Sequence, residues 1–420
     1  MLPQRPDFLE QPTFLPRVTR HDGRAIEEAL AGPSLFDRGV RLEGAVVEAS
    51  YAAEEPPLLK RLREEAVPQL IDPQTLRFTG ERFVSVERLA GLPYAPAGPI
   101  TAQTFTTVQA EALARGVMLF QQTSSAACYL AAGLPCYDDD LPTWLDHNER
   151  LRAAACKANG GSDLDRRPLI AQLAPGRKAL AEPGVVSRRL LDYPIDAVYV
   201  QPLRLNPVGD SLEKLAGYVG FLLALRDEGL PVIAGRVGAF GLLLQALGIS
   251  AFDSGLSRAE AFELAGLNRP LTERERNNPG KGGGPDRRIY FERLKTTLPG
   301  RHAARVLADR DLRSRFTCTL GCCEHGGFEE LPDRRRTHYL WTRHHEIEEL
   351  RNSPTLGMRE DAVHEQLRDA REEAVVVRRT LAGQTDDLPA FDHLERWIGV
   401  LIREGGLSQA AWRAGVGSTA

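Results

Sequence analysis

Aspartate, glutamine and arginine side chains follow several short apolar runs of this sequence, at the points where strands are expected to end. The residues at these points that could bind or react are Asp72, Asp138, Asp139, Asp140, Gln172, Gln201, Arg204, Arg236, Gly238 and Asp253. In parallel βα architectures the active site lies at the carboxyl ends of the strands, so we expect these residues to meet at one end of the molecule. Two carboxylates that meet there could act as a nucleophile and as a general acid/base. An aspartate after a strand is also a common N-cap of the next helix, and for each Asp alone that interpretation stays open.

The elements that must position these residues alternate along the chain from Gln69 onward. Short apolar runs that predict strands are separated by longer amphipathic segments that predict helices. The expected strands are 69–71, 116–120, 169–173, 197–200, 231–234 and 249–252, and the expected helices are 107–114, 146–158, 184–191, 211–228 and 239–247. Six or more such units favour a closed α/β barrel of the TIM type, (β/α)8, over an open sheet.

The predicted domain organisation has three parts. Residues 1–65 are of mixed character and predict an N-terminal extension, although 40–47 alternate like a strand. Residues 66–310 predict the barrel, with a polar, Gly-rich loop at 272–287. Residues 311–420 contain a Cys/His cluster followed by charged helical segments, so we expect a C-terminal helical subdomain.

Composition excludes several classes of protein. The 420 residues are 42% hydrophobic and 26% charged, which is ordinary for a globular chain and unlike a disordered or fibrous one. The net charge of −4 means that a nucleic-acid partner would need a local basic face. Arg334–Arg336, with Tyr339 and Trp341 nearby, predict either such a face or a solvated helix start. We find no secretory signal and no apolar run long enough to span a bilayer, so we expect a cytoplasmic protein without a membrane partner.

Four soft metal ligands lie within eight residues of one another. These are Cys318, Cys322, Cys323 and His325. Zinc is held by four thiolate or imidazole ligands in tetrahedral geometry, and such a cluster predicts a structural zinc ion. The alternative is a group of buried cysteines with histidines at the surface.

The motifs of the central region resemble those of tRNA-guanine transglycosylases, in the same order, over about residues 65–350. Residues 230–255 resemble the stretch in which a Gly-rich loop and a helix with a Leu-Leu pair precede the nucleophilic aspartate, here Asp253. Ile71-Asp72-Pro73 is similar to the strand end that carries the general base. Tyr137–Pro142, Ile170–Gln172 and Val200–Leu203 resemble the motifs that hold the base.

The resemblance implies base exchange at an N-glycosidic bond of a nucleic acid. Asp253 would form the covalent glycosyl-enzyme and Asp72 would move protons. The substrate-binding residues would be Asp138, Gln172, Gln201, Arg204, Arg236 and Gly238. The expected partners are nucleic acid (tRNA or DNA) and a purine-like base, as in queuosine or 7-deazaguanine modification, with a homodimer or a heteromeric partner as the open forms of assembly. Glycines that let the family's pocket approach a purine are replaced here, for example by Leu173-Ala174.

Two alternatives to a transglycosylase stay open. One is a catalytically silent barrel that binds nucleic acid or a partner subunit, which the missing glycines favour. The other is a barrel lyase or hydrolase for a small carboxylate or phosphorylated substrate, with a metal ion near Asp138–Asp140.

Overall fold

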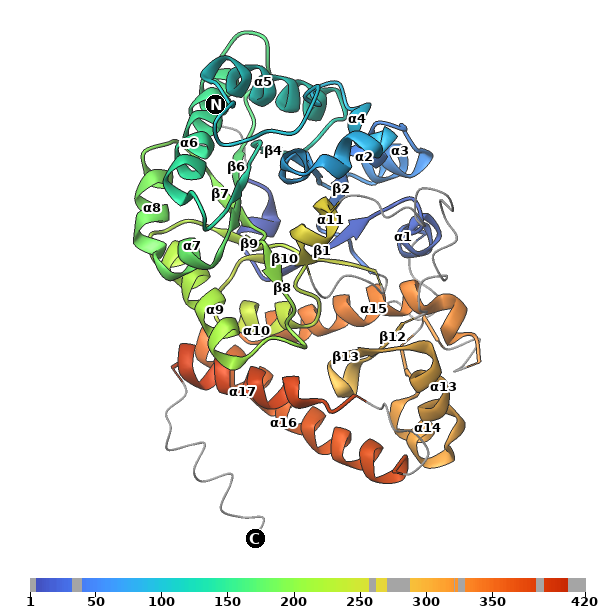
Figure 1. Cartoon of the computed structure of the whole chain (residues 1–420). Coiled ribbons are helices and arrows are strands. Elements are labelled where there is room, and N and C mark those ends of the chain that lie inside the picture. The colour runs from blue at the N-terminus through green and yellow to red at the C-terminus, as the bar shows by residue number, and fades with distance from the viewer. Residues whose placement is uncertain are drawn as a thin grey trace.

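Parallel strands form a nearly closed eight-stranded barrel in the computed structural model of the chain (Figure 1). The model describes residues 5–31, 40–256, 262–269, 288–320, 322–323, 329–382 and 389–406. The barrel strands are β1 (Thr13–Val18), β2 (Ala45–Glu48), β3 (Gln69–Asp72), β4 (Tyr129–Leu130), β6 (Leu169–Pro175), β7 (Ala197–Val200), β9 (Val232–Ala234) and β10 (Ala251–Gly255). Their order is β3-β2-β1-β10-β9-β7-β6-β4, and the short β5 (Pro135–Cys136) also pairs with β6. The backbone N–H of Ala127 donates to the carbonyl of Gln69 at 2.9 Å and so joins the two end strands.

The strands alternate between two hydrophobic environments, as a barrel requires. Residues that face the interior form one core cluster with members from all eight strands, among them Leu15, Val46, Ile170 and Ile233. Their neighbours in sequence belong to the larger core cluster between the barrel and its helices. Phe8 and Leu9 of the 3-10 helix η1 (Asp7–Leu9) join the interior cluster and are buried at 0% and 4% exposure. The amino-terminal residues therefore help to fill the barrel.

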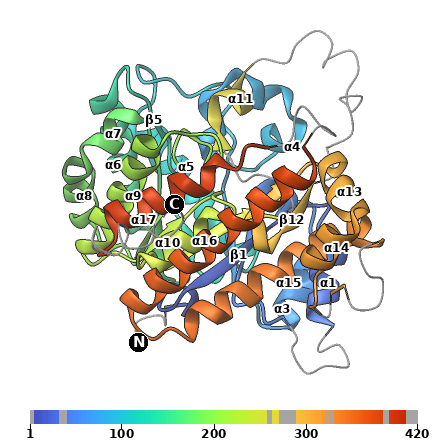
Figure 2. The ribbon, with the colours of Figure 1, turned by 90° about the horizontal axis from the view of Figure 1, so that it is seen from below.

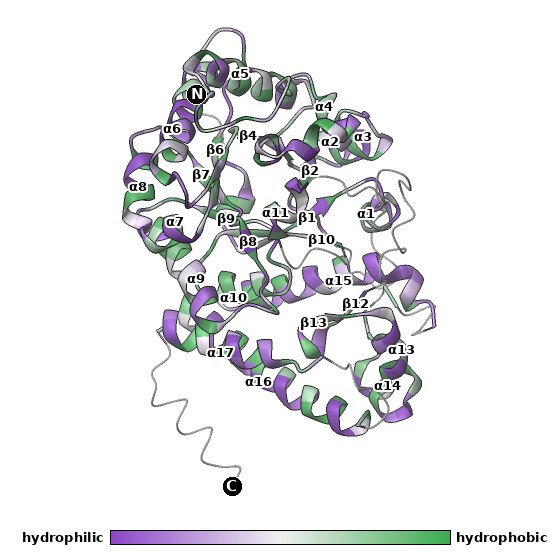
Figure 3. Ribbon diagram, in the orientation of Figure 1, coloured by the Kyte–Doolittle hydropathy of each residue, from purple (hydrophilic) through white to green (hydrophobic). Residues whose placement is uncertain are grey.

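Helices cover the outside of the barrel. Those before β10 are α1 (Gly23–Leu30), α2 (Ala49–Ala52), α3 (Pro57–Glu64), α4 (Glu87–Ala90), α5 (Thr107–Thr123), α6 (Leu141–Asn159), α7 (Arg177–Ala181), α8 (Pro183–Leu191), α9 (Leu212–Asp227) and α10 (Phe240–Ala246). The helix α5 starts at a capping box in which Thr106 and Gln109 satisfy each other's backbone N–H groups. Figure 3 shows hydrophilic and hydrophobic residues alternating along these helices.

A small structure lies over one side of the carboxyl end of the barrel. It consists of the antiparallel pair β8 (Arg204–Leu205) and β11 (Phe262–Glu263), the helix α11 (Leu264–Asn268) and the 3-10 helices η2 (Thr75–Thr79) and η3 (Glu81–Ser85). Leu76, Ala174, Phe262 and Leu264 form its core, with Leu203 packed against them. We call β8, β11 and α11 the cap.

The C-terminal region is helical and packs against the barrel (Figure 2). It contains the hairpin β12 (Ile289–Phe291) and β13 (Thr296–Leu298), joined by η4 (Glu292–Leu294), and the helices α13 (Gly300–Ala308), α14 (Arg310–Phe316), α15 (Leu331–Arg351), α16 (Leu356–Thr380) and α17 (Asp392–Glu404). Trp397 of α17 is buried against Phe240 of α10, with the ring centroids 5.4 Å apart. No helix among the described residues is long and apolar enough to cross a membrane.

The α/β class, the barrel and the helical C-terminal region are confirmed, but two expectations need correction. Residues 1–65 are not an extension, because β1 and β2 are barrel strands between β10 and β3. The run 116–120 is not a strand, because it lies inside α5. A short apolar run looks the same in a buried strand and in a buried helix, which explains the second error. The 272–287 loop lies outside the described residues.

Candidate functional site

Arg17 lies between the two aspartates that the sequence singles out. Its Nη1 donates to Oδ2 of Asp72 at 2.8 Å, and its Nε donates to Oδ2 of Asp253 at 2.7 Å. These three residues come from β1, β3 and β10, and strict alternation along each strand turns them all into the barrel. The expected pair of acids therefore converges, and a guanidinium separates it.

Further donors occupy the remaining oxygens of both carboxylates. The hydroxyl of Tyr199, across the barrel on β7, donates to Oδ2 of Asp253 at 3.2 Å and accepts from Nη2 of Arg17 at 2.6 Å. The backbone N–H of Arg236 donates to Oδ1 of Asp253, and that of Gln74 donates to Oδ1 of Asp72 at 2.9 Å. A carboxylate whose oxygens all accept hydrogen bonds is a weak nucleophile, because attack would require those donors to leave.

Arg17, Asp72, Tyr199 and Asp253 form one hydrogen-bonded group, which we call the polar layer, and it is buried. Arg17, Asp72 and Asp253 are 1%, 3% and 0% exposed. Burial alone would lower the pKa of Arg17, but the neighbouring Asp253, Tyr199 and Asp72 raise it well above its usual value. Burial likewise favours the neutral form of Asp72, and Arg17 and Arg236 outweigh it, so that the pKa of Asp72 is lowered. Arg17 and Asp72 are therefore charged and compensate each other, and Asp253 shares the same guanidinium at 2.7 Å.

A cavity of about 650 Å³ opens directly beside this layer. It is within the size range of small-molecule sites. Its lining includes Arg17 but neither Asp72 nor Asp253. Basic side chains outnumber acidic ones in the lining: Arg17, Arg20, His21, Arg88, Arg236 and Arg336 against Asp22 and Glu48. We call it the arginine cavity. Glu48 of β2 binds Arg236 at 2.7 Å and lies 3.7 Å from Arg17.

Two of the predicted binding residues lie on the other side of the barrel mouth. Gln172 and Gln201 are each 2% exposed. The hydroxyl of Thr75 donates to Oε1 of Gln172 at 3.3 Å, but Nε2 of Gln172 and Oε1 of Gln201 have no hydrogen-bond partner among the residues that the structure describes. Unsatisfied buried amides are uncommon in native proteins, and such groups call for a water molecule or a ligand.

Arg236 and Gly238 shape the loop between β9 and α10. Both have positive φ, 59° for Arg236 and 58° for Gly238. The left-handed turn directs the N–H of Arg236 at Asp253 and its guanidinium at Glu48 and the cap, where Phe262 of β11 lies 5.5 Å below it. Arg236 therefore connects the polar layer, the arginine cavity and the cap.

The other predicted binding residues lie apart from this layer. Oδ1 of Asp138 accepts the backbone N–H of Lys178 in the first turn of α7 at 2.8 Å, so it binds a helix that lies beyond the next strand and is not the N-cap of α6. Asp139 accepts the N–H of Asp140 just before α6, and no metal-ligand group within the described ranges includes either residue. Arg204 is exposed on β8 and lies 3.8 Å from Glu263 of β11.

The basic run 334–336 lies at the start of α15. Arg336 lines the arginine cavity and pairs with Asp22 at 3.1 Å, and Arg334 pairs with Glu28 at 3.5 Å. Tyr339 is fully buried, so it cannot stack on a base, and Trp341 is half-buried. The aromatic part of the expected nucleic-acid face is therefore missing.

The cysteine cluster gathers around a histidine of α15. Sγ of Cys318 is 3.7 Å from Sγ of Cys322, which is 3.7 Å from Sγ of Cys323, and Nδ1 of His338 is 3.5 Å from Cys323 and 3.7 Å from Cys322. These three cysteines and His338 form a Cys₃His grouping that is compatible with a metal ion. The residue expected as the fourth ligand, His325, lies outside the described residues.

The surroundings of His338 prepare it for ligation. Its Nε2 is 2.9 Å from the carbonyl of Tyr290, so Nδ1 is left to face the sulfurs, as the outer partner of a metal-bound histidine does. Hydrogen bonds from Cys322 and Cys323 lower the pKa of Cys318. Burial disfavours the charged form of His338, but its sulfur neighbours raise its pKa to about 10. Cys318 therefore favours the thiolate, whereas Cys318 and Cys323 raise the pKa of Cys322. The positive charge beside Cys318 is the protonated His338, and a bound metal ion would take the place of that proton.

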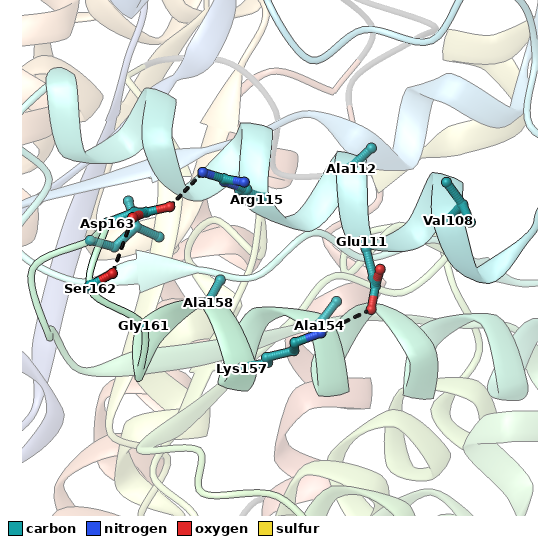
Figure 4. A pocket seen from close by; sticks show the side chains of 11 residues that line it. Val108, Glu111, Ala112, Arg115, Ala154, Lys157, Ala158, Gly161, Ser162 and Asp163 are labelled. Atoms are coloured by element: carbon teal, nitrogen blue, oxygen red, sulfur yellow. Dashed lines mark hydrogen bonds and ion pairs between the residues drawn. The ribbon is translucent and has the colours of Figure 1, made fainter.

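A second cavity, of about 450 Å³, lies on the surface between α5 and α6 (Figure 4). Ala112, Ala154 and Ala158 contribute to its wall, and the pairs Glu111–Lys157 and Arg115–Asp163 cross it. None of the predicted site residues lines it.

Sequence reasoning missed Arg17, Glu48, Tyr199 and His338. Arg17, Glu48 and Tyr199 each face the barrel interior near the carboxyl end of a strand. For Arg17 the signal in the sequence is the alternation Phe14-Leu15-Pro16-Arg17-Val18. Pro16 obscures the signal, because a proline argues against a central strand. His338 lies on a predicted helix, 15 residues from Cys323, and only the packing of α15 brings it to the cluster.

Comparison of the chain with protein-family models and with curated proteins finds no match. The site must therefore be interpreted from its own geometry.

Proposed function

We propose that the protein binds a nucleic acid at the barrel mouth and that Asp253 and Asp72 hold the polar layer together instead of exchanging a base. The observation that carries this proposal is the position of Arg17, whose guanidinium separates the two acids from the arginine cavity. A ligand in the cavity meets arginines, not a free carboxylate.

The arginine cavity favours a phosphate-bearing ligand. Guanidinium groups bind phosphate oxygens through paired hydrogen bonds, and they are weakly hydrated. Arg20 is exposed at the rim, with His21 as its hydrogen-bond partner. Arg24, also exposed, extends the basic surface along α1. A chain of net charge −4 gains a local basic face in this way.

The unsatisfied amides favour a heterocycle beneath the cap. Nε2 of Gln172 offers a donor and Oε1 of Gln201 offers an acceptor, and the edge of a purine-like base presents both kinds of group. A base that forms hydrogen bonds with these two amide atoms would relieve the cost of leaving them unpaired, and this would favour its binding. A base inserted under the cap and a phosphate in the arginine cavity would belong to one nucleotide unit.

Binding of labelled single-stranded RNA and DNA tests this function. We expect Arg20→Ala to weaken binding and to reduce the dependence of log K on log salt by about one unit, as loss of one phosphate contact does. Arg115→Ala is the matched control, because Arg115 is equally exposed but lies at the α5–α6 cavity. Equal binding by both variants and the wild type would contradict the assignment of the cavity.

Base exchange is the second candidate, and the convergence of Asp253 and Asp72 on one residue favours it. It requires that Arg17 and Tyr199 withdraw from Asp253 when substrate binds. Incorporation of labelled guanine into tRNA or DNA decides between the two. Under the first proposal the wild type incorporates none, whereas exchange that Asp253→Asn abolishes would establish the second.

We also propose that the fold is of the TIM type and that the Cys₃His cluster holds structural zinc. The order of strands, the helices outside and the polar carboxyl end support the first. Three thiolates and an imidazole with no further ligand among the described residues support the second.

A further inference from the structure

A histidine and two glutamates lie close together between η4 and α15, and their ligand atoms are oxygen and nitrogen, unlike those of the cysteine cluster. Glu292 comes from η4, and His345 and Glu349 are one turn apart on α15. One ligand atom of each lies within 4.8 Å of the others. Nε2 of His345 is 3.4 Å from Oε1 of Glu349. The hairpin β12–β13 lies beside α15 in Figure 1, so two separate elements supply the group.

Glu292 is the residue of this group that calls for an explanation. It is half-buried, and within the described part of the chain its carboxylate has no hydrogen bond or ion pair. The nearby Lys295 forms its ion pair with the buried Glu346 instead, at 2.6 Å from Nζ to Oε1. A carboxylate withdrawn from water without a partner is costly, and a bound cation would remove that cost.

The group borders a cavity of about 420 Å³ that is rich in acids. Glu292 and Glu349 line it together with Asp369, Glu372 and Glu373. Its basic residues are already engaged: Arg293 and Arg315 both bind Glu373, and Lys295 binds Glu346. The carboxylates of Asp369 and Glu372 therefore make the electrostatic potential of the cavity negative next to Glu292 and Glu349.

We propose that Glu292, His345 and Glu349 bind a divalent transition-metal ion, with the remaining coordination positions open to the cavity. Two carboxylate oxygens and one imidazole nitrogen suit Mn²⁺, Fe²⁺, Co²⁺ or Zn²⁺. Three protein ligands beside open space are the arrangement of sites that also bind water or substrate, unlike the closed Cys₃His cluster. The chain therefore has two metal sites of different chemistry.

Cobalt substitution of the whole chain tests this proposal, because the two sites differ in absorption. Only the cysteine site gives thiolate-to-metal charge transfer, whereas a site of oxygen and nitrogen ligands gives ligand-field bands alone. We expect two Co²⁺ ions per chain, the second without a charge-transfer band. Glu292→Gln and His345→Gln should each weaken the second site by about 10- to 100-fold or more, the loss seen when even an outer partner of a metal ligand is removed.

His344→Gln is the matched control, since it removes the adjacent histidine of the same helix. It should leave both ions bound, and circular dichroism should show that all three variants are folded. Binding of a single Co²⁺, or a second ion that neither Glu292→Gln nor His345→Gln weakens, would overturn the proposal.

Discussion

Arg17 and Asp253 are 236 positions apart in the chain, yet Nε of Arg17 donates to Oδ2 of Asp253 at 2.7 Å inside the barrel. The pair links the first strand of the barrel to the last. Because both groups are buried and charged, each is stable only while the other is present.

Arg17→Met should destabilise the protein by about 3–5 kcal/mol, because it leaves two buried carboxylates without their shared cation. Urea denaturation measures the change. Arg20→Met, three residues along and exposed, should change stability by no more than about 0.5 kcal/mol. Similar stabilities for the two variants would mean that the polar layer does not hold the barrel together.

Gly235→Ala should destabilise the protein by about 1–3 kcal/mol, because a Cβ there would lie 2.6 Å from Oη of Tyr199. The tyrosine would have to move away from Arg17. Gly217→Ala on α9 is the control: its Cβ would meet nothing within 4 Å. That change should stabilise the helix by about 0.5–1 kcal/mol, so thermal melts of the two variants should shift in opposite directions.

His393 should make the protein sensitive to mild acid. Burial against Phe391 and Trp397 lowers its pKa to about 3. Its pKa in the unfolded chain is about 6.5, so between pH 6.5 and 3 the unfolded state binds one proton more. Stability is therefore complete above pH 6.5 and falls with pH by about 1.4 kcal/mol per unit. His393→Phe should remove that slope between pH 5 and 6.5 in urea titrations, and an unchanged slope would contradict the prediction.

Removal of metal by a chelator should lower the melting temperature, because the Cys₃His cluster ties the segment before α15 to α15 itself. His338→Gln should abolish tight zinc binding at this cluster, as measured by metal analysis after dialysis. His325→Gln should leave it intact, since three cysteines and His338 already fill four positions. The reverse result would make His325 the ligand.

The sequence predicts the central part of the fold better than its ends. From Gln69 to Phe252, β3, β6, β7, β9 and β10 fall on expected runs, because buried parallel strands are short and apolar. Pro16 obscures the pattern of β1, whereas the alternation of 40–47 predicts a strand close to β2 but not its place in the barrel. Nothing in the local sequence states that β1 pairs with β10, because that pairing depends on closure of the whole barrel.

The same division applies to the candidate site. Asp72, Asp253, Gln172 and Gln201 are predicted from their places at strand ends, and all four are buried at the barrel mouth. Asp138 and Arg204 follow strands too, but β5 and β8 are peripheral two-residue strands and direct them elsewhere. Charge compensation by Arg17 is a tertiary property, so no spacing rule could have predicted it.

The place of β1 between β2 and β10 bears on how the chain emerges from the ribosome. The amino-terminal strand is made first, but one of its two neighbours is among the last barrel segments to be synthesised. Until β10 is synthesised, Arg17 cannot form its buried ion pair with Asp253. We therefore expect nascent chains that end before residue 250 to remain unfolded or bound to chaperones, with the barrel closing late in translation.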